Sequence, residues 1–172
     1  MSFDSDDFAL FGLPRRFALD QAELASRRRA LQSEVHPDRF AAGGASAQRV
    51  AMQWAVRVNE AFDRLKNPLK RAAYLCELNG VAIDAEDNTA MPPEFLIQQM
   101  AWREALDDAA THVAVGAIAG DIGAHRRAAY DELARSLDES ADYARAAQQV
   151  RALMFVERFM NDVSDRLESM GA

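Results

Sequence analysis

The chain has 172 residues, 20 Lys and Arg against 27 Asp and Glu, a formal net charge of −7, and 49% hydrophobic residues. This length fits one or two small domains and excludes a large α/β enzyme, and the hydrophobic content excludes an intrinsically disordered chain. No apolar stretch approaches the roughly 18 residues that a membrane span needs, and the acidic start does not resemble a signal peptide. We therefore expect a soluble, cytoplasmic, folded protein.

The net charge conceals an uneven distribution. Up to Leu75 there are 12 basic and 9 acidic residues, and beyond it there are 8 basic and 18 acidic ones, which gives +3 and −10. A polar stretch with turn-forming residues follows this division and is typical of a connection. We predict two domains of opposite charge, 1–78 and 92–172, joined by residues 79–91.

The helices are predicted in chain order from periodicity and capping signals, because alternating β-branched residues that indicate strands are absent. A short helix over 6–11 should stop at Gly12, and the next helix should begin at the capping box Asp20 to Glu23 and end before Pro37. Further helices are predicted over 46–65, 69–78, 93–109, 112–137 and 140–170. The core stripe of the helix over 46–65 is predicted to be Val50, Trp54, Val58, Ala61 and Leu65.

Cys76 is the only cysteine, so an intramolecular disulfide and a multi-cysteine zinc or iron–sulfur site are excluded. Its apolar helix favours a small buried side chain over a nucleophile. The three histidines lack metal-ligand spacing, and the basic run His125–Arg127 is predicted to be solvated surface. Because no nucleophile, base and orienting group can be assembled, we expect no enzyme, no cofactor and no metal.

The tripeptide His36-Pro37-Asp38 stands between two predicted helices. Pro37 fixes its φ near −65° and removes a hydrogen-bond donor, so His36 and Asp38 are displayed in a limited geometry. Taken singly, these residues also fit a plain helix stop followed by a turn. Together with the arginine-bearing helix before them and the Gly-containing loop and long helix after them, they resemble the J-domain of DnaJ-type co-chaperones.

Further motifs carry the resemblance over nearly the whole chain. Segments 8–14, 36–40, 59–62, 65–75 and 93–96 together resemble the HscB family, the J-type co-chaperones of iron–sulfur cluster assembly, in its bacterial form without an N-terminal zinc-binding cysteine motif. The resemblance implies an all-α fold with an N-terminal J-domain helical hairpin and a C-terminal three-helix bundle. It also implies that the chain stimulates the ATPase of a seventy-kilodalton HscA-type chaperone and delivers an IscU-type scaffold to it for maturation of iron–sulfur proteins.

The first predicted binding surface is for the chaperone. A basic helix face would steer the domain to an acidic chaperone surface, and the Asp38 carboxylate could accept a hydrogen bond from a chaperone arginine. Arg29 stands at a position that is basic in the family, and Arg27 is expected to share its exposed face. Arg28 stands where the family has a core aromatic residue, so we expect a snorkelling stem or a shifted helix. The resemblance assigns this surface to His36, Pro37, Asp38, Arg29, Arg27 and Arg39, whereas the arginines also fit a solvated face.

The second predicted surface lies on the helix over 93–109. At about 100° per residue, Phe95, Gln99, Trp102 and Leu106 share one sector, which should face the bundle. The opposite sector carries large apolar side chains rimmed by acids, which favours a partner site over packing against another helix or the first domain. The resemblance assigns scaffold binding to Leu96, Ile97, Met100, Ala101, Glu104 and Asp108, with Phe155 from the last helix. At Ala101 the family often carries an acid.

Two other functions stay open. A J-domain protein with a different client would differ from an HscB-type protein only in its partner. A helical nucleic-acid-binding module would use Arg27–Arg29 and Arg39, but the net charge and the lack of a base-stacking aromatic platform disfavour nucleic acid.

Overall fold

The computed structural model describes residues 4–36, 44–84 and 91–171, and these form α-helices without any strand. The all-α fold is thereby confirmed. The chain divides into two compact units, Met1–Leu75 and Cys76–Ala172. The finer domain limits stay a prediction, and each unit is described by itself below.

The first helix of the first unit, α1, spans Asp7–Leu10. Its N-cap is Asp6, whose side chain accepts a hydrogen bond from the Ala9 N–H over 3.0 Å. The chain leaves the helix at Gly12, which has a φ of +63°. This left-handed conformation is available to glycine without steric cost, so the predicted stop at Gly12 is confirmed.

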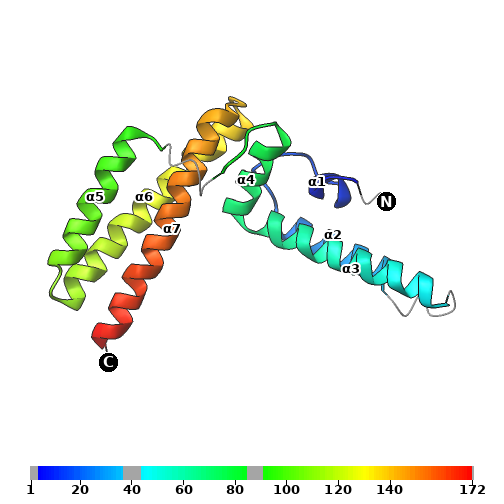
Figure 1. Cartoon of the computed structure of the whole chain (residues 1–172), viewed down its shortest axis with the longest axis horizontal. Coiled ribbons are helices and arrows are strands. Elements are labelled where there is room, and N and C mark those ends of the chain that lie inside the picture. The colour runs from blue at the N-terminus through cyan, green and yellow to red at the C-terminus, as the bar shows by residue number, and fades with distance from the viewer. Residues whose placement is uncertain (1–3, 37–43, 85–90, 172) are drawn as a thin grey trace. The chain divides into compact units, whose positions relative to one another are not determined.

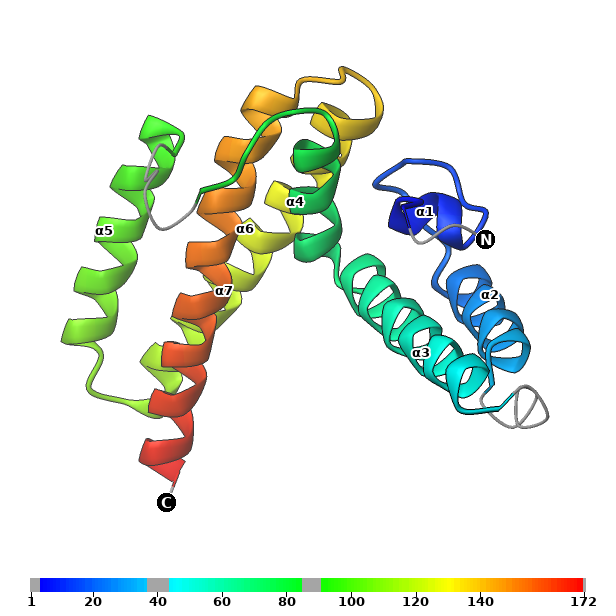
Figure 2. The same cartoon turned by 45° about the vertical axis from the view of Figure 1, so that its right-hand side comes forward.

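Helices α2 (Gln21–Glu34) and α3 (Gly44–Lys66) lie side by side in opposite directions (Figures 1 and 2). The Asp20 carboxylate caps α2 by accepting hydrogen bonds from the Ala22 and Glu23 N–H groups, over 2.8 and 3.2 Å. The predicted start of this helix is confirmed. Two orphan N–H groups of the first turn are satisfied in this way.

The predicted core stripe of α3 is correct at its C-terminal end and wrong at its start. Val58, Ala61 and Leu65 are fully buried and Trp54 is half-buried, but Val50 is 45% exposed. Val50, Trp54 and Val58 are spaced four residues apart, and four residues turn the helix by about 400°, or about 40° more than a full turn. Each step from Val58 toward the N-terminus therefore moves the side chain about 40° away from the buried face. Two steps before Val58, the side chain of Val50 has left that face.

A buried ion cluster joins α1 to α3. The Asp7 side chain is fully buried, and its two carboxylate oxygens lie 2.6 Å from Arg57 Nη1 and 2.7 Å from Arg64 Nη1. The Asp7 backbone N–H donates to the Tyr74 hydroxyl over 3.1 Å. A buried carboxylate needs such pairing, because an unpaired ion is costly to desolvate.

Replacing Asp7 with alanine is expected to lower the free energy of unfolding by about 3 kcal/mol, because two arginines lose their buried partner. Urea denaturation followed by far-UV circular dichroism measures this loss. The matched control is Asp63→Ala, which removes an exposed carboxylate from α3 and should change stability by less than about 0.5 kcal/mol. Equal losses in the two variants would show that the ion cluster does not stabilise the unit.

Helix α4 spans Pro68–Leu78 and crosses the boundary between the two units. The Asn67 side chain accepts a hydrogen bond from the Lys70 N–H over 3.0 Å at the start of this helix. The predicted break between the third and fourth helices is thereby confirmed. The buried Arg71 donates through Nε to the Phe17 carbonyl over 2.9 Å and so ties α4 to the segment before α2.

The second unit is a three-helix bundle of α5 (Pro93–Asp108), α6 (His112–Asp138) and α7 (Tyr143–Gly171) (Figures 1 and 2). Helices α6 and α7 form a long antiparallel pair, and α5 packs alongside them. The bundle implied by the family resemblance is confirmed. Its core cluster consists of Phe95, Trp102, Ala109, Val115, Ile122, Ala152, Val156, Phe159 and Val163.

The prediction that His125–Arg127 is solvated surface is wrong for His125, whereas the side chain of Arg126 is 42% exposed and Arg127 is exposed. The His125 ring packs edge-on against Trp102, with the ring centroids 4.9 Å apart. Arg126 Nε donates to Glu157 Oε1 over 2.6 Å, and the Tyr130 hydroxyl donates to the same oxygen over 3.0 Å. Burial, with the Glu157 carboxylate, raises the pKa of Tyr130 to about 12. Both hydrogen bonds join α6 to Glu157 on α7. Because Glu157 lies 31 residues beyond Arg126, no local pattern in the sequence indicates this contact.

Candidate partner-binding surfaces

The exposed arginines of α2 lie on two flanks of the helix. Arg27 pairs with Glu23 one turn earlier, with Nη2 and Oε1 3.2 Å apart, and both side chains are about half exposed. Arg29 is also exposed. At about 100° per residue, residues two positions apart are rotated by about 200° around the helix axis. Arg27 and Arg29 therefore lie on different sides of α2, and the expectation that they share one exposed face is wrong.

Arg28 lies between these flanks and packs on α3. Its guanidinium carbon is 4.2 Å from the centroid of the Phe62 ring, and its Nη2 donates to Asn59 Oδ1 over 3.1 Å. Gln32 Nε2 donates to the same oxygen, also over 3.1 Å. The guanidinium head therefore packs on the Phe62 ring in a cation–π contact with its Nε buried, and does not reach solvent on a snorkelling stem as expected. Arg28 joins α2 to α3 and does not form part of the exposed basic surface.

His36 comes directly after the end of α2. Val35 is buried and its N–H donates to the Leu31 carbonyl over 3.0 Å, which closes the last turn. The next residue, His36, is exposed. The other predicted chaperone-binding residues of this loop, Pro37, Asp38 and Arg39, lie outside the described residues.

The outer face of α5 is an apolar strip, which we define as Leu96, Ile97 and Met100. These side chains are 41%, 73% and 70% exposed. On the opposite side of the helix, Phe95 and Trp102 are buried in the bundle, as the helical spacing predicts. Within the described residues of the second unit, no helix covers the strip. The remaining predicted scaffold-binding residues of this helix, all exposed, are Ala101, Glu104 and Asp108.

Phe155 on α7 is half-buried at the margin of the core. Its ring centroid lies 5.7 Å from that of Phe95, and the Arg103 guanidinium lies 5.3 Å from it. Arg103 follows Leu96 by two helical turns and stands on the same flank of α5. Phe155 therefore lies at the α5–α7 boundary, between the core residue Phe95 and the exposed Arg103.

Cys76 is fully buried. Burial, and to a smaller extent the nearby Glu77 carboxylate, raises the pKa of the Cys76 thiol from 9.0 to about 11. A thiol of this kind is a poor nucleophile, because the thiolate is the reactive form.

We expect iodoacetamide at pH 8 to alkylate Cys76 in the folded chain about 100-fold more slowly than in urea, since two pKa units lower the thiolate fraction by that factor. Between pH 9 and about 11 the folded chain keeps this proton while the unfolded chain loses it. Stability should therefore fall as the pH rises through this window. Mass spectrometry of the alkylated chain measures the rates, and equal rates in both states would contradict the burial of the thiol.

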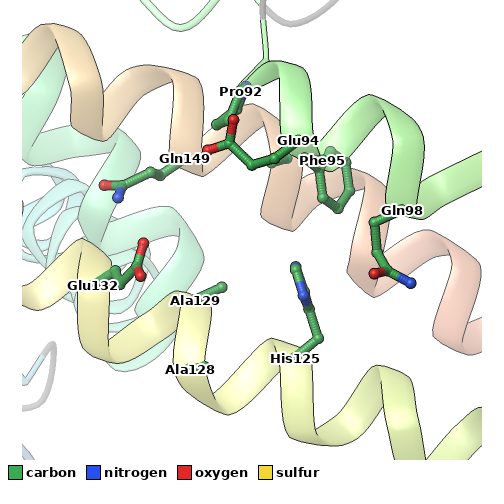
Figure 3. Close-up of a pocket in the computed structure, with 10 residues that line it drawn as sticks. Pro92, Glu94, Phe95, Gln98, His125, Ala128, Ala129, Glu132 and Gln149 are labelled. Carbon is green, nitrogen blue, oxygen red and sulfur yellow. The ribbon is translucent and has the colours of Figure 1, made fainter.

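Over the described ranges, no group of three or more His, Cys, Asp or Glu side chains is arranged to hold a metal ion. In the same ranges, no helix has the length and apolar character that crossing a membrane requires. The second unit also has a pocket of about 320 Å³ between the bundle helices, with a mainly apolar lining to which His125, Glu132 and Gln149 add polar groups (Figure 3). No spacing in the sequence indicates it, because its walls come from three helices.

The comparisons with known proteins agree with this architecture. The family model described as the HSCB C-terminal oligomerisation domain matches residues 91–164. The co-chaperone protein HscB homolog of Burkholderia multivorans is 49% identical over 173 residues, which cover 99% of this chain and 98% of the relative. The chaperone HscB from Vibrio cholerae has a TM-score of 0.81 and 35% identity, covering 96% of this chain and 99% of its own. The crystal structure of human co-chaperone protein HscB has a TM-score of 0.88 and 26% sequence identity. The match covers 100% of this chain and 86% of the human chain.

The all-helical fold and the full-length similarity define the class as a co-chaperone. The chain belongs to the HscB family.

Proposed function

We propose that the chain stimulates the ATPase of an HscA-type chaperone and delivers an IscU-type scaffold to it for maturation of iron–sulfur proteins. The observation that carries the proposal is the uncovered apolar strip on α5 in one unit, while His36 is exposed at the end of α2 in the other. Two surfaces on two units allow one chain to hold two partners. Membership of the HscB family supports this pairing.

The first unit would dock on the ATP-bound chaperone through residues 36–39 and the exposed arginines of α2. The net charge of +3 up to Leu75 favours encounter with an acidic chaperone surface, and such steering raises the association rate more than the final affinity. Pro37 restricts the backbone beside His36, which lowers the entropy cost of docking. The chain itself supplies no catalytic group in this scheme, so the chemistry stays in the chaperone and the chain acts as a cytoplasmic activator.

The second unit would hold the scaffold on the apolar strip, with Phe155 at its margin. Apolar side chains at the centre and acids such as Glu104 and Asp108 at the rim match the usual anatomy of a protein interface. Ala101 offers no charge at a position where the family often has one, so its contribution is shape alone.

The test is a steady-state ATPase assay with a purified HscA-type chaperone and IscU-type scaffold from a Burkholderia relative. The chain should raise the hydrolysis rate, and chain and scaffold together should raise it by more than the sum of their separate effects. Stimulation without any response to the scaffold would indicate a different client. Absence of stimulation would contradict the proposed function.

A further inference from the structure

Segment 59–62 on α3 carries part of the family resemblance but has no role in the partner surfaces described above. Its first residue, Asn59, contacts the second half of α2. The Asn59 Oδ1 accepts one hydrogen bond from Arg28 Nη2 and one from Gln32 Nε2, each over 3.1 Å. Both lone pairs of this oxygen are therefore used by donors that stand about one helical turn apart on α2.

Helix α2 has little apolar packing to hold its end. Of its 14 residues, all within the described range 4–36, only Leu24 in the first turn is buried. Val35 at the C-cap is also buried, whereas Leu31 between them is half-buried. A helix is usually held on its neighbour by a continuous apolar stripe. In the second half of α2, the polar contact with Asn59 takes over part of this task.

The contact fixes both the rotation and the axial position of α2. Moving the helix by one residue shifts it by about 1.5 Å along its axis and turns it by about 100°, which breaks a side-chain hydrogen bond. Arg28 is held a second time, because its guanidinium carbon lies 4.2 Å from the centroid of the Phe62 ring, about one turn beyond Asn59. The hydrogen bond from Arg28 is also charge-assisted and therefore stronger than a neutral one.

The same contact lies next to the end of α2 that precedes His36. Gln32 comes four positions before His36, which is about one helical turn. The last turn closes through the hydrogen bond from the Val35 N–H to the Leu31 carbonyl, over 3.0 Å. Helix ends fray readily. The hydrogen bond from Gln32 to Asn59 therefore restrains the turn that His36 follows.

We propose that Asn59 is a positioning residue for chaperone stimulation, because it holds the end of α2 in the orientation in which the chaperone contacts His36. This role rests on the proposed function. Asn59 acts only through Arg28 and Gln32. Without its side chain, α2 would adopt the binding orientation for a smaller fraction of the time. The apparent affinity for the chaperone falls by that fraction, while the maximal stimulated rate is unchanged.

The first experiment compares Asn59→Ala with Asn59→Asp in the steady-state ATPase assay. Asn59 is exposed, so neither change opens a cavity. Alanine removes the acceptor and should raise the chain concentration for half-maximal stimulation about fivefold, with an unchanged maximal rate. Aspartate keeps acceptor oxygens for both donors and should stay within about twofold of the parent. The matched control is Gln53→Ala, which removes an exposed amide elsewhere on α3 and should behave as the parent does.

The second experiment separates positioning from a loss of overall stability, by amide hydrogen exchange of the full chain. In Asn59→Ala the Val35 N–H should exchange about fivefold faster than in the parent, because the last turn of α2 opens more often. The Leu24 N–H, which donates to the Asp20 carbonyl over 3.0 Å at the other end of α2, should exchange at the parent rate. Equal acceleration at both ends would show a merely structural role and would overturn the proposal.

A double-mutant cycle tests whether Gln32 acts through Asn59. Gln32→Ala alone should raise the half-maximal concentration about twofold, and it should add nothing in the Asn59→Ala background. Additive effects of the two changes would contradict the proposed route.

The outcomes also separate this proposal from the proposed function. If Asn59→Ala has the half-maximal concentration of the parent while His36→Gln loses stimulation, the positioning role is wrong and the proposed function stands. If the parent chain does not stimulate the chaperone, the proposed function fails and the positioning role fails with it.

Discussion

The His36→Gln variant is expected to lose stimulation of the chaperone ATPase while binding the scaffold as the parent chain does. His36 is exposed directly after the buried Val35, so its replacement removes a surface group without opening the core. Glutamine keeps a polar side chain but loses the imidazole ring. We expect the stimulated rate to fall at least about tenfold, which corresponds to about 1.4 kcal/mol of coupling between chain and chaperone.

The measurement is the steady-state ATPase rate across a range of chain concentrations, with scaffold affinity measured separately by calorimetry. His112→Gln is the matched control, because His112 is an exposed histidine in the second unit. It should leave both activities unchanged. If His36→Gln still stimulated the chaperone as the parent does, the assignment of the chaperone contact to this loop would be wrong.

The second large effect is expected for the double variant Leu96→Ala/Met100→Ala. Both side chains belong to the apolar strip and are 41% and 70% exposed, so their truncation leaves no cavity in the bundle. Scaffold affinity should fall by about 30-fold, or about 2 kcal/mol, because each truncation removes apolar surface whose burial by the scaffold is worth about 1 kcal/mol. Stimulation of the chaperone in the absence of scaffold should stay at the parent level.

Calorimetric titration of scaffold into each variant gives the affinity directly. Val113→Ala is the control, since Val113 on α6 is 82% exposed and lies outside the strip. Loss of scaffold-free stimulation in the double variant would contradict the division of labour between the two units. Unchanged scaffold affinity would show that the partner binds elsewhere.

Local signals in the sequence were sufficient for the helices and for the face of α5. The cap at Asp20 and the helix end at Gly12 depend only on residues a few positions away, so both can be predicted from the local sequence. The burial of Phe95 and Trp102 opposite the apolar strip follows from helical periodicity alone.

Contacts between residues that are far apart in the sequence could not be predicted from local patterns. Asp7 meets Arg64 across 57 positions and Arg126 meets Glu157 across 31, and no local pattern marks such partners. His125 was predicted as surface because its neighbours are basic, although Trp102 from another helix covers its ring. The pocket at Gln149 was missed for the same physical reason, since three helices must assemble before its walls exist.

The cluster around Asp7 also bears on the order in which the chain folds during synthesis. The α1 carboxylate is made early, yet its partners Arg57 and Arg64 follow by 50 residues or more, and the hydroxyl of Tyr74 follows by 67. Until those residues leave the ribosome, α1 is not stable alone, because the hydrogen bonds of a four-residue helix do not offset the free-energy cost of helix nucleation. We therefore expect α1 to become ordered only after α3 has been made, and to gain its last partner, Tyr74, when α4 emerges.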